Sequence, residues 1–169
     1  LGALHTAGSL SKALAMFGGY TTLYGNISSE GAVYAVMSSY GDVMVGHGRE
    51  DLLNAKLIIM WGWDPVRMIS GTDCILNLTK AKEKGIPIIL IDPRYTHTGA
   101  VFADEWIPII PGTDAAMMAA MANVIVKKNL QDQTFLDKYT VGFDVFKDYV
   151  LGTDDGIEKT PEWASKICG

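Results

Sequence analysis

Two continuous apolar runs, separated by an amphipathic segment, are the most regular feature of the chain. The runs span residues 55–61 and 86–91, and unbroken apolar runs of this length are typical of strands that are buried on both faces. Between them, residues 72–84 carry apolar side chains at helical spacing, and Gly85 follows. This order predicts a strand–helix–strand unit of a parallel sheet, with a right-handed crossover.

A third strand and further helices are expected after this unit. Residues 105–110 predict a shorter strand, and residues 115–128 predict an Ala- and Met-rich helix with lysines at its C-terminal end. Residues 132–139 predict another helix, and Pro161 fits the first position of a last helical turn. The predicted fold class is therefore α/β, a three-layer architecture in which helices cover both faces of a mostly parallel sheet.

The first fifty residues are rich in glycine and predict short helices joined by irregular segments. Residues 9–17 and 30–37 favour helices, and Ser28 or Ser29 is placed to cap the second one. Glycine and polar residues recur through residues 38–50, which predicts an irregular connection there.

The chain is long enough for one domain with a sizeable core. It has 169 residues, of which 49% are apolar. We divide it into the Gly-rich segment at residues 1–50 and an α/β domain at residues 51–169. Because the chain opens on Leu-Gly-Ala rather than on methionine, we expect one compact domain excised from a longer chain.

Charge and composition exclude several kinds of function. Fourteen basic and nineteen acidic residues give a net charge of −5, which argues against a domain that binds nucleic acid. No apolar stretch of about 18 residues predicts a transmembrane span, and no signal peptide is evident. Cys74 and Cys168 lie far apart without a CxxC pattern, so a cysteine-built zinc or iron–sulfur site within this chain is not expected.

Three turns share one design, in which an acidic residue stands beside proline or glycine after an apolar run. They lie at residues 61–65, 91–95 and 110–114. Because ligands of open parallel sheets bind outside the carboxyl ends of the strands, we expect the three turns to meet at one crevice. The alternative is that each turn simply ends a strand with ordinary turn residues.

The residue types in these turns suit a purine nucleotide that carries a diphosphate. Asp92 follows the second strand, where an acid commonly holds ribose hydroxyls. Asp114 can accept hydrogen bonds from a purine N–H edge, and Thr113 stands with it at a helix N-terminus that favours anions. Arg67 and Arg94 follow strand ends and suit phosphate. The alternative for each is an ordinary surface arginine.

Other familiar signatures are missing or ambiguous. The sequence contains neither the GxGxxG dinucleotide pattern nor a P-loop. Strand alternation predicts that Trp61 and Trp63 point to the same face, either to stack on a ring or to pack. The histidines at positions 5, 47 and 97 form no ligand-spaced cluster, and His97 lies nearest the expected crevice.

Residues 91–100 and 104–116 closely resemble the molybdopterin oxidoreductases of the dimethyl sulfoxide reductase family. Residues 129–139 and 159–164 fit the same family, so the resemblance covers nearly the whole chain from about Phe17. Within the family, the chain is most similar to the catalytic (A) subunit of the branch that also has an iron–sulfur subunit and a membrane-anchor subunit.

The resemblance implies an α/β domain that holds one of two molybdopterin guanine dinucleotides around a molybdenum atom. Its fold is a Rossmann-like variant without the glycine pattern. The implied cofactor-binding residues are Trp61, Gly62, Trp63, Asp64, Pro65, Arg67, Asp92, Pro93, Arg94, Thr96, Gly112, Thr113 and Asp114. At position 64 the family usually has Asn, and an ionised Asp cannot donate the hydrogen bond that Asn can.

The resemblance also implies a metal ligand in the first segment. Residues 25–29 are similar to the family's Gly-Asp-Tyr-Ser-Thr loop, whose serine supplies an oxygen ligand to molybdenum, and the match places that ligand and catalytic residue on Ser28. Asn26 and Ile27 depart from the family pattern, and the neighbouring Ser29 leaves the register open by one residue.

For the parent enzyme, the resemblance implies reduction of a small oxidised substrate, a sulfoxide or N-oxide, by oxygen-atom transfer to Mo(IV) in anaerobic respiration. Its partners would be the other domains of the subunit, one of which carries an iron–sulfur cluster near the N-terminus, and the iron–sulfur and membrane-anchor subunits. A bacterial enzyme exported by the twin-arginine route is implied, with the present piece soluble, not inserted into a membrane and inactive alone.

Three alternatives remain. Another reaction of the family is possible, such as trimethylamine N-oxide, selenate or polysulfide reduction or formate oxidation, although a serine at position 28 disfavours formate oxidation. A non-catalytic nucleotide-binding domain of the same fold is disfavoured by the acids at positions 92 and 114. A nicotinamide-dependent dehydrogenase is disfavoured by the missing glycine pattern.

Overall fold

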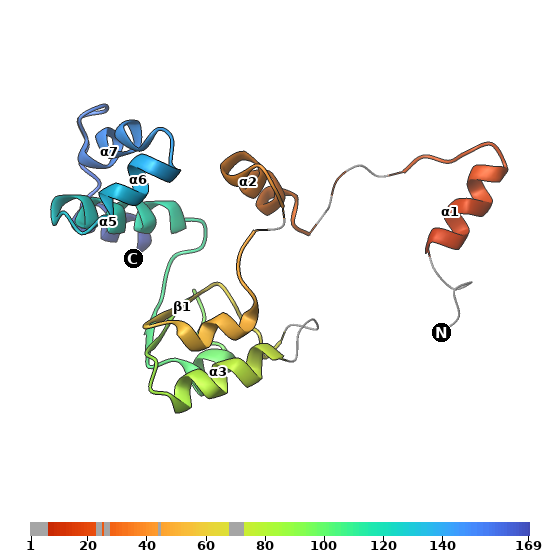
Figure 1. The fold of residues 1–169 in the computed structure, drawn as a ribbon, viewed down its shortest axis with the longest axis horizontal. Coiled ribbons are helices and arrows are strands. Elements are labelled where there is room, and N and C mark those ends of the chain that lie inside the picture. The colour runs from red at the N-terminus through yellow and green to blue at the C-terminus, as the bar shows by residue number, and fades with distance from the viewer. Residues whose placement is uncertain (1–6, 23–24, 26–27, 44, 68–72) are drawn as a thin grey trace. The chain divides into compact units, whose positions relative to one another are not determined.

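The computed structural model describes the chain except for residues 1–6, 23–24, 26–27, 44 and 68–72. The chain divides into two units, Leu1–His47 and Gly48–Gly169, each with its own internal contacts (Figure 1). We describe each unit by itself. The domain boundary that the sequence suggests at residue 50 stays a prediction.

The first unit contributes two helices close to the predicted positions. Helix α1 spans Ala7–Met16 and helix α2 spans Glu30–Tyr40. Ser29 is the N-cap residue of α2, but its side chain makes no capping hydrogen bond. Helix α2 ends at Gly41, whose φ of 75° is the left-handed conformation that glycine adopts easily.

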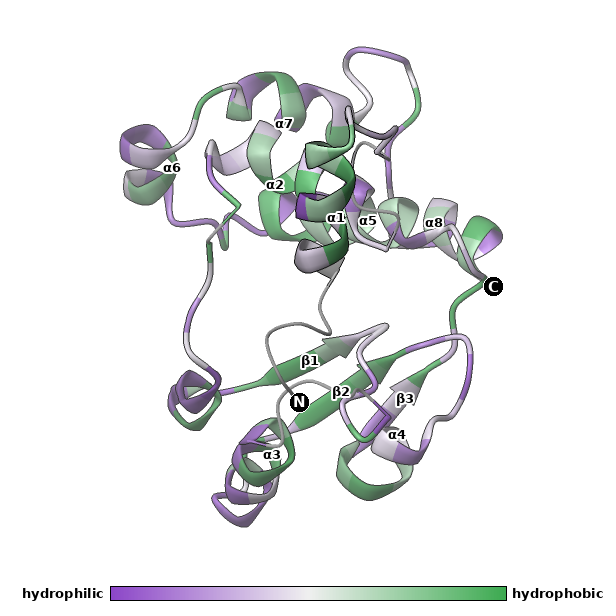
Figure 2. Cartoon of the chain, turned by 90° about the vertical axis from the view of Figure 1, so that its right-hand side faces the viewer, coloured by the Kyte–Doolittle hydropathy of each residue, from purple (hydrophilic) through white to green (hydrophobic). Residues whose placement is uncertain are grey.

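The second unit contains a parallel sheet with the strand order β1-β2-β3. The strands are β1 (Ile58–Trp61), β2 (Ile88–Ile91) and β3 (Glu105–Ile107), and all three arrows point the same way in Figure 2. In register, Ile58 pairs with Ile88 and Ile89 pairs with Glu105. The predicted parallel arrangement is therefore confirmed.

The observed strands are shorter than the apolar runs that predict them. Strand β2 begins directly after Pro87, and strand β3 ends directly before Pro108. Proline has no backbone N–H and cannot donate to a strand ladder. The apolar residues beyond these prolines still contribute to packing, for example Ile109, which is 5% exposed.

One face of the sheet is covered by helix α3 (Asp73–Glu83), helix α4 (His97–Phe102) and the 3-10 helix η2 (Arg49–Asn54). The buried cluster on this face consists of Ile58, Met60, Leu78, Ala81, Ile88, Leu90 and Phe102, with Leu52 and Leu53 of η2 packed against it. The short helices α4 and η2 were not predicted, because their apolar positions are too few to show a helical period.

The other face is covered by helix α5 (Asp114–Lys127) and helix α8 (Pro161–Cys168). Its buried cluster consists of Ile91, Ile109, Ala120, Ala164 and Cys168. Helices therefore cover both faces of the parallel sheet, which confirms the predicted α/β class. Figure 2 shows the same division, with the hydrophobic strand β2 in the centre of the sheet.

Two further helices complete the second unit. Helix α6 spans Gln133–Tyr139, and helix α7 spans Phe143–Leu151 and packs on α5 through buried Val150. Asn123 of α5 is 1% exposed and donates from Nδ2 to the carbonyl of Val150 at 2.9 Å. Among the described residues, no helix is both long and apolar enough to cross a membrane.

Candidate functional site

A polar pocket lies where the chain leaves strands β1 and β2. Its volume is 160 Å³, and six residues from the two turns line it: Asp64, Arg67, Arg94, Tyr95, Thr96 and His97. The two turns lie together because β1 and β2 are adjacent and parallel, so that their carboxyl ends lie at the same edge of the sheet. Two arginines from separate turns, Arg67 and Arg94, therefore line one pocket.

The first turn is held against its neighbouring strand by backbone bonds. Gly62 has a φ of 58°, and its N–H donates to the carbonyl of Ile91 at 2.9 Å. Further on, the N–H of Arg67 donates to the carbonyl of Asp64 at 3.1 Å and closes the turn. The positive φ needed at position 62 explains why a glycine follows the strand.

The second turn is organised by the Asp92 side chain. Oδ1 of Asp92 accepts from the N–H of Arg94 at 2.8 Å, as in a local Asx turn. The Asp92 carbonyl accepts from Nε1 of Trp106 at 2.8 Å. Helix α4 then begins after Thr96, whose Oγ1 accepts from the N–H of Gly99 at 3.1 Å. Asp92 is only 7% exposed, so its visible role is to shape the turn that carries Arg94.

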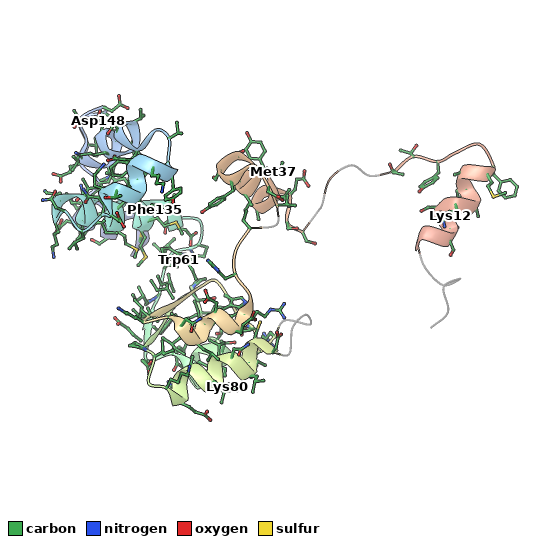
Figure 3. All side chains as sticks on the ribbon, in the orientation of Figure 1. Lys12, Met37, Trp61, Lys80, Phe135 and Asp148 are labelled. Atoms are coloured by element: carbon green, nitrogen blue, oxygen red, sulfur yellow. The ribbon has the colours of Figure 1, made fainter. Side chains whose placement is uncertain are left out.

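The third turn leads into helix α5 and is joined to strand β1 by one side-chain bond. Nε1 of Trp61 donates to Oδ1 of Asp114 at 2.7 Å, and Trp61 is labelled in Figure 3. Thr113 donates from Oγ1 to the carbonyl of Ile110 at 2.7 Å, and Gly112 has a φ of 82°. The bond from Trp61 uses one of the two carboxylate oxygens of Asp114.

The prediction that Trp61 and Trp63 share a face is wrong. Trp61 packs against the cluster under α5 and α8, whereas Trp63 packs against the cluster under α3 and α4. Strand β1 ends at Trp61, and the left-handed Gly62 breaks the two-residue alternation that the prediction extended beyond the strand.

The structure brings together only part of the predicted site. Asp64, Arg67, Arg94 and Thr96 line the polar pocket, but the other predicted cofactor-binding residues, Asp92 and Asp114 among them, do not. Pro65 is buried and Pro93 is exposed. Tyr95 and His97, which the sequence did not single out as ligand contacts, also line the pocket. The sequence could have indicated these two pocket residues, because Tyr95 and His97 directly neighbour the predicted residues Arg94 and Thr96.

The predicted metal ligand lies in the first unit. Ser28 is exposed and directly precedes Ser29, the N-cap residue of α2. Asn26 and Ile27 of the same loop lie outside the described residues, as do His5 and Thr72. Across the described part of the chain, no group of three or more His, Cys, Asp or Glu side chains is placed to hold a metal ion.

The chemistry of the polar pocket suits a phosphorylated ligand. Guanidinium groups bind phosphate oxygens in pairs, and a threonine hydroxyl can donate to a third oxygen. A larger pocket of 490 Å³ between α5 and α8 has a different character, because isoleucine, methionine, alanine and proline line most of it and no charged residue does. The polar pocket is therefore the better fit to the polar end of a nucleotide cofactor.

A parallel α/β unit with a polar pocket at its strand ends defines a class of proteins that bind ligands at that edge. The model of the molybdopterin oxidoreductase family matches residues 2–156. The chain therefore belongs to the molybdopterin oxidoreductase family.

Named relatives agree with this membership. The chain is 44% identical to dimethyl sulfoxide reductase DmsA of Haemophilus influenzae over 95% of its length. It is 44% identical to DmsA of Escherichia coli over 90% of its length, and 34% identical to trimethylamine-N-oxide reductase of Vibrio cholerae over 99%. Among solved structures, it is similar to acetylene hydratase from Pelobacter acetylenicus, with a TM-score of 0.55 and 29% identity over 68% of this chain and 15% of that one.

The chain is a piece of a much larger enzyme. It spans 22% of the Haemophilus relative, 20% of the Escherichia relative and 22% of the Vibrio relative. Membership of the molybdopterin oxidoreductase family therefore applies to this chain, whereas the reactions in the relatives' names are those of much longer proteins.

Proposed function

We propose that the unit at Gly48–Gly169 binds the guanine dinucleotide end of a molybdopterin cofactor. The meeting of Arg67 and Arg94 in one pocket carries this proposal. The two positive charges balance much of the charge of a diphosphate, and the pocket lies at the sheet edge where parallel α/β proteins bind such groups. Thr96 lines the same pocket, although its hydroxyl also caps α4.

Asp114 is the residue that we assign to guanine. A carboxylate only accepts hydrogen bonds, and the guanine edge offers two adjacent N–H donors that adenine does not offer in that arrangement. The bond from Trp61 at 2.7 Å fixes one carboxylate oxygen in place. Asp92 would contribute on the ribose side, mainly through the turn that it shapes.

Ser28 is assigned to the metal end of the cofactor, as an oxygen ligand of molybdenum, with Ser29 as the alternative. The serine hydroxyl must lose its proton to bind the metal. When bound, the cofactor supplies two-electron oxygen-atom transfer, and the chain's own residues bind and orient it. Ser28 and the polar pocket thus have separate tasks.

For the parent enzyme, the similarity to DmsA supports reduction of a sulfoxide to a sulfide, with two electrons and two protons consumed and water released. The trimethylamine-N-oxide reductases among the relatives favour an N-oxide as the second candidate substrate. Electrons would reach the cofactor from iron–sulfur clusters in other parts of the subunit and in a partner subunit, with a membrane-anchor subunit completing an enzyme of anaerobic respiration exported by the twin-arginine route.

Calorimetric titration of the 169-residue chain with GDP, GMP and ADP tests the nucleotide site. We expect GDP to bind more tightly than ADP, and Asp114→Ala to remove this preference. Asp144→Ala is the matched control, because Asp144 also stands in the first turn of a helix, but that helix, α7, follows helix α6 and not a strand of the sheet. Equal binding of ADP and GDP by the wild-type chain would contradict the guanine assignment, and absence of GDP binding would contradict the nucleotide site that we propose.

A further inference from the structure

A fully buried hydroxyl beside the polar pocket has no part in the contacts proposed so far. Thr98, the second residue of α4, is 0% exposed. Its Oγ1 accepts from the N–H of Val66 at 3.2 Å and donates to Oδ1 of Asp64. Both partners belong to the turn after β1, whereas Thr98 itself follows the turn after β2. The hydroxyl therefore joins the two turns that form the pocket.

We infer that Thr98 is a positioning residue for the phosphate-binding pocket, which it serves by fixing the Asp64–Arg67 turn against the turn that carries Arg94. This inference rests on the proposed function. The bond between the Arg67 N–H and the Asp64 carbonyl closes the first turn on itself. Thr98 lies four residues after Arg94, so its two bonds set the spacing between the two arginines.

A hydroxyl is well suited to this position because it donates and accepts at once. One side chain thereby satisfies a backbone N–H and a carboxylate in a partly buried contact. The bond to Asp64 also offsets part of the negative charge that a carboxylate brings into a pocket for phosphate. The side chain at position 64 thus serves as the acceptor for Thr98 through its Oδ1.

The test compares Thr98→Val, which keeps the shape but can neither donate nor accept, with Thr98→Ser, which keeps both abilities. Thr79→Val is the control, because the Thr79 hydroxyl donates to the carbonyl of Ile75 in its own helix, at 2.9 Å, and not to another element. Two quantities are measured on the 169-residue chain: hydrogen exchange of the Val66 amide without ligand, and the Kd and stoichiometry for GDP.

We expect Thr98→Val to expose the Val66 amide to exchange and to raise the Kd for GDP about five- to tenfold at unchanged stoichiometry, as the loss of one or two hydrogen bonds implies. Thr98→Ser should restore both values. A variant that is merely less folded would lower the stoichiometry instead.

Two results would overturn the inference: unchanged exchange of the Val66 amide in Thr98→Val, or a Kd for GDP equal to that of the wild type. Absence of GDP binding by the wild-type chain would overturn the proposed function. It would also overturn the link between Thr98 and phosphate, while the amide measurement would still decide whether Thr98 holds the turn.

Discussion

The bond between Trp61 and Asp114 offers the sharpest test of how the third turn is held. Trp61→Phe keeps an aromatic ring but removes the N–H that donates to Oδ1 of Asp114 at 2.7 Å. Hydrogen bonds to charged groups contribute roughly 1.5–3 kcal/mol. Because both residues are only partly buried, water replaces some of the lost bond. We therefore expect the free energy of unfolding to fall by about 1 kcal/mol.

A double-mutant cycle isolates this bond from the packing of the ring. The free energy of unfolding is measured in urea for the wild type, Trp61→Phe, Asp114→Ala and the double variant. The coupling should be close to 1 kcal/mol, well above the roughly 0.3–0.5 kcal/mol within which independent sites add. Trp63→Phe with Asp114→Ala is the control pair, because Trp63 packs against the opposite face of the sheet.

The result that refutes this reasoning is additivity of Trp61→Phe and Asp114→Ala. It would mean that the indole contributes through packing alone. In that case, Trp61 would have no influence on the direction of the Asp114 carboxylate. If the coupling is present, Trp61→Phe should also reduce the preference for GDP over ADP, because a carboxylate with a free side-chain torsion distinguishes the two bases less well.

Three further outcomes are expected. In calorimetry, Arg94→Ala should weaken the binding of GDP far more than the binding of guanosine. Arg49→Ala is the control and should leave both affinities unchanged, since Arg49 pairs with Asp73 outside the polar pocket. Equal losses of affinity for GDP and guanosine in Arg94→Ala would contradict a phosphate-binding role for Arg94. Leu78→Ala should lower the free energy of unfolding by about 2–5 kcal/mol in urea, because the Leu78 side chain is 0% exposed in the cluster under α3; a loss below about 1 kcal/mol would show that this core is loose. The backbone N–H of Ile88, and after it Lys82, lower the pKa of Asp104 below its ordinary value of 3.8. The ionised Asp104 therefore stabilises the folded state above about pH 4, and this stabilisation is lost as the pH falls through the lowered pKa. Asp104→Asn should flatten the acid limb of a plot of unfolding free energy against pH, and an unchanged limb would contradict this.

The sequence predicts the sheet well because apolar periodicity is a local property. Buried strands need continuous apolar runs, and the runs at 55–61 and 86–91 contain β1 and β2. Likewise, the residues that form the second turn act within that turn: Asp92 accepts from an N–H two positions away. Such contacts follow from neighbouring residues and the stereochemistry of the backbone.

The candidate site was only partly predictable. The three strand-end turns were identified from their acids, prolines and glycines, and the arginines at positions 67 and 94 do line one pocket. The prediction failed for the direction of Trp63, because the rule of alternation ends where the strand ends. The assignment of nucleotide and metal contacts to individual residues stays a prediction.

By itself, the sequence determined the α/β class, the order of the elements and the turns at which chemistry is concentrated, because each depends on local spacing and residue type. Only the tertiary structure decided which side chains meet. Trp61 meets Asp114 across 53 positions, and Thr98 meets Asp64 across 34. Parallel strands bring such residues together because each crossover returns the chain to the same edge of the sheet, and no local pattern encodes the partner on the next strand.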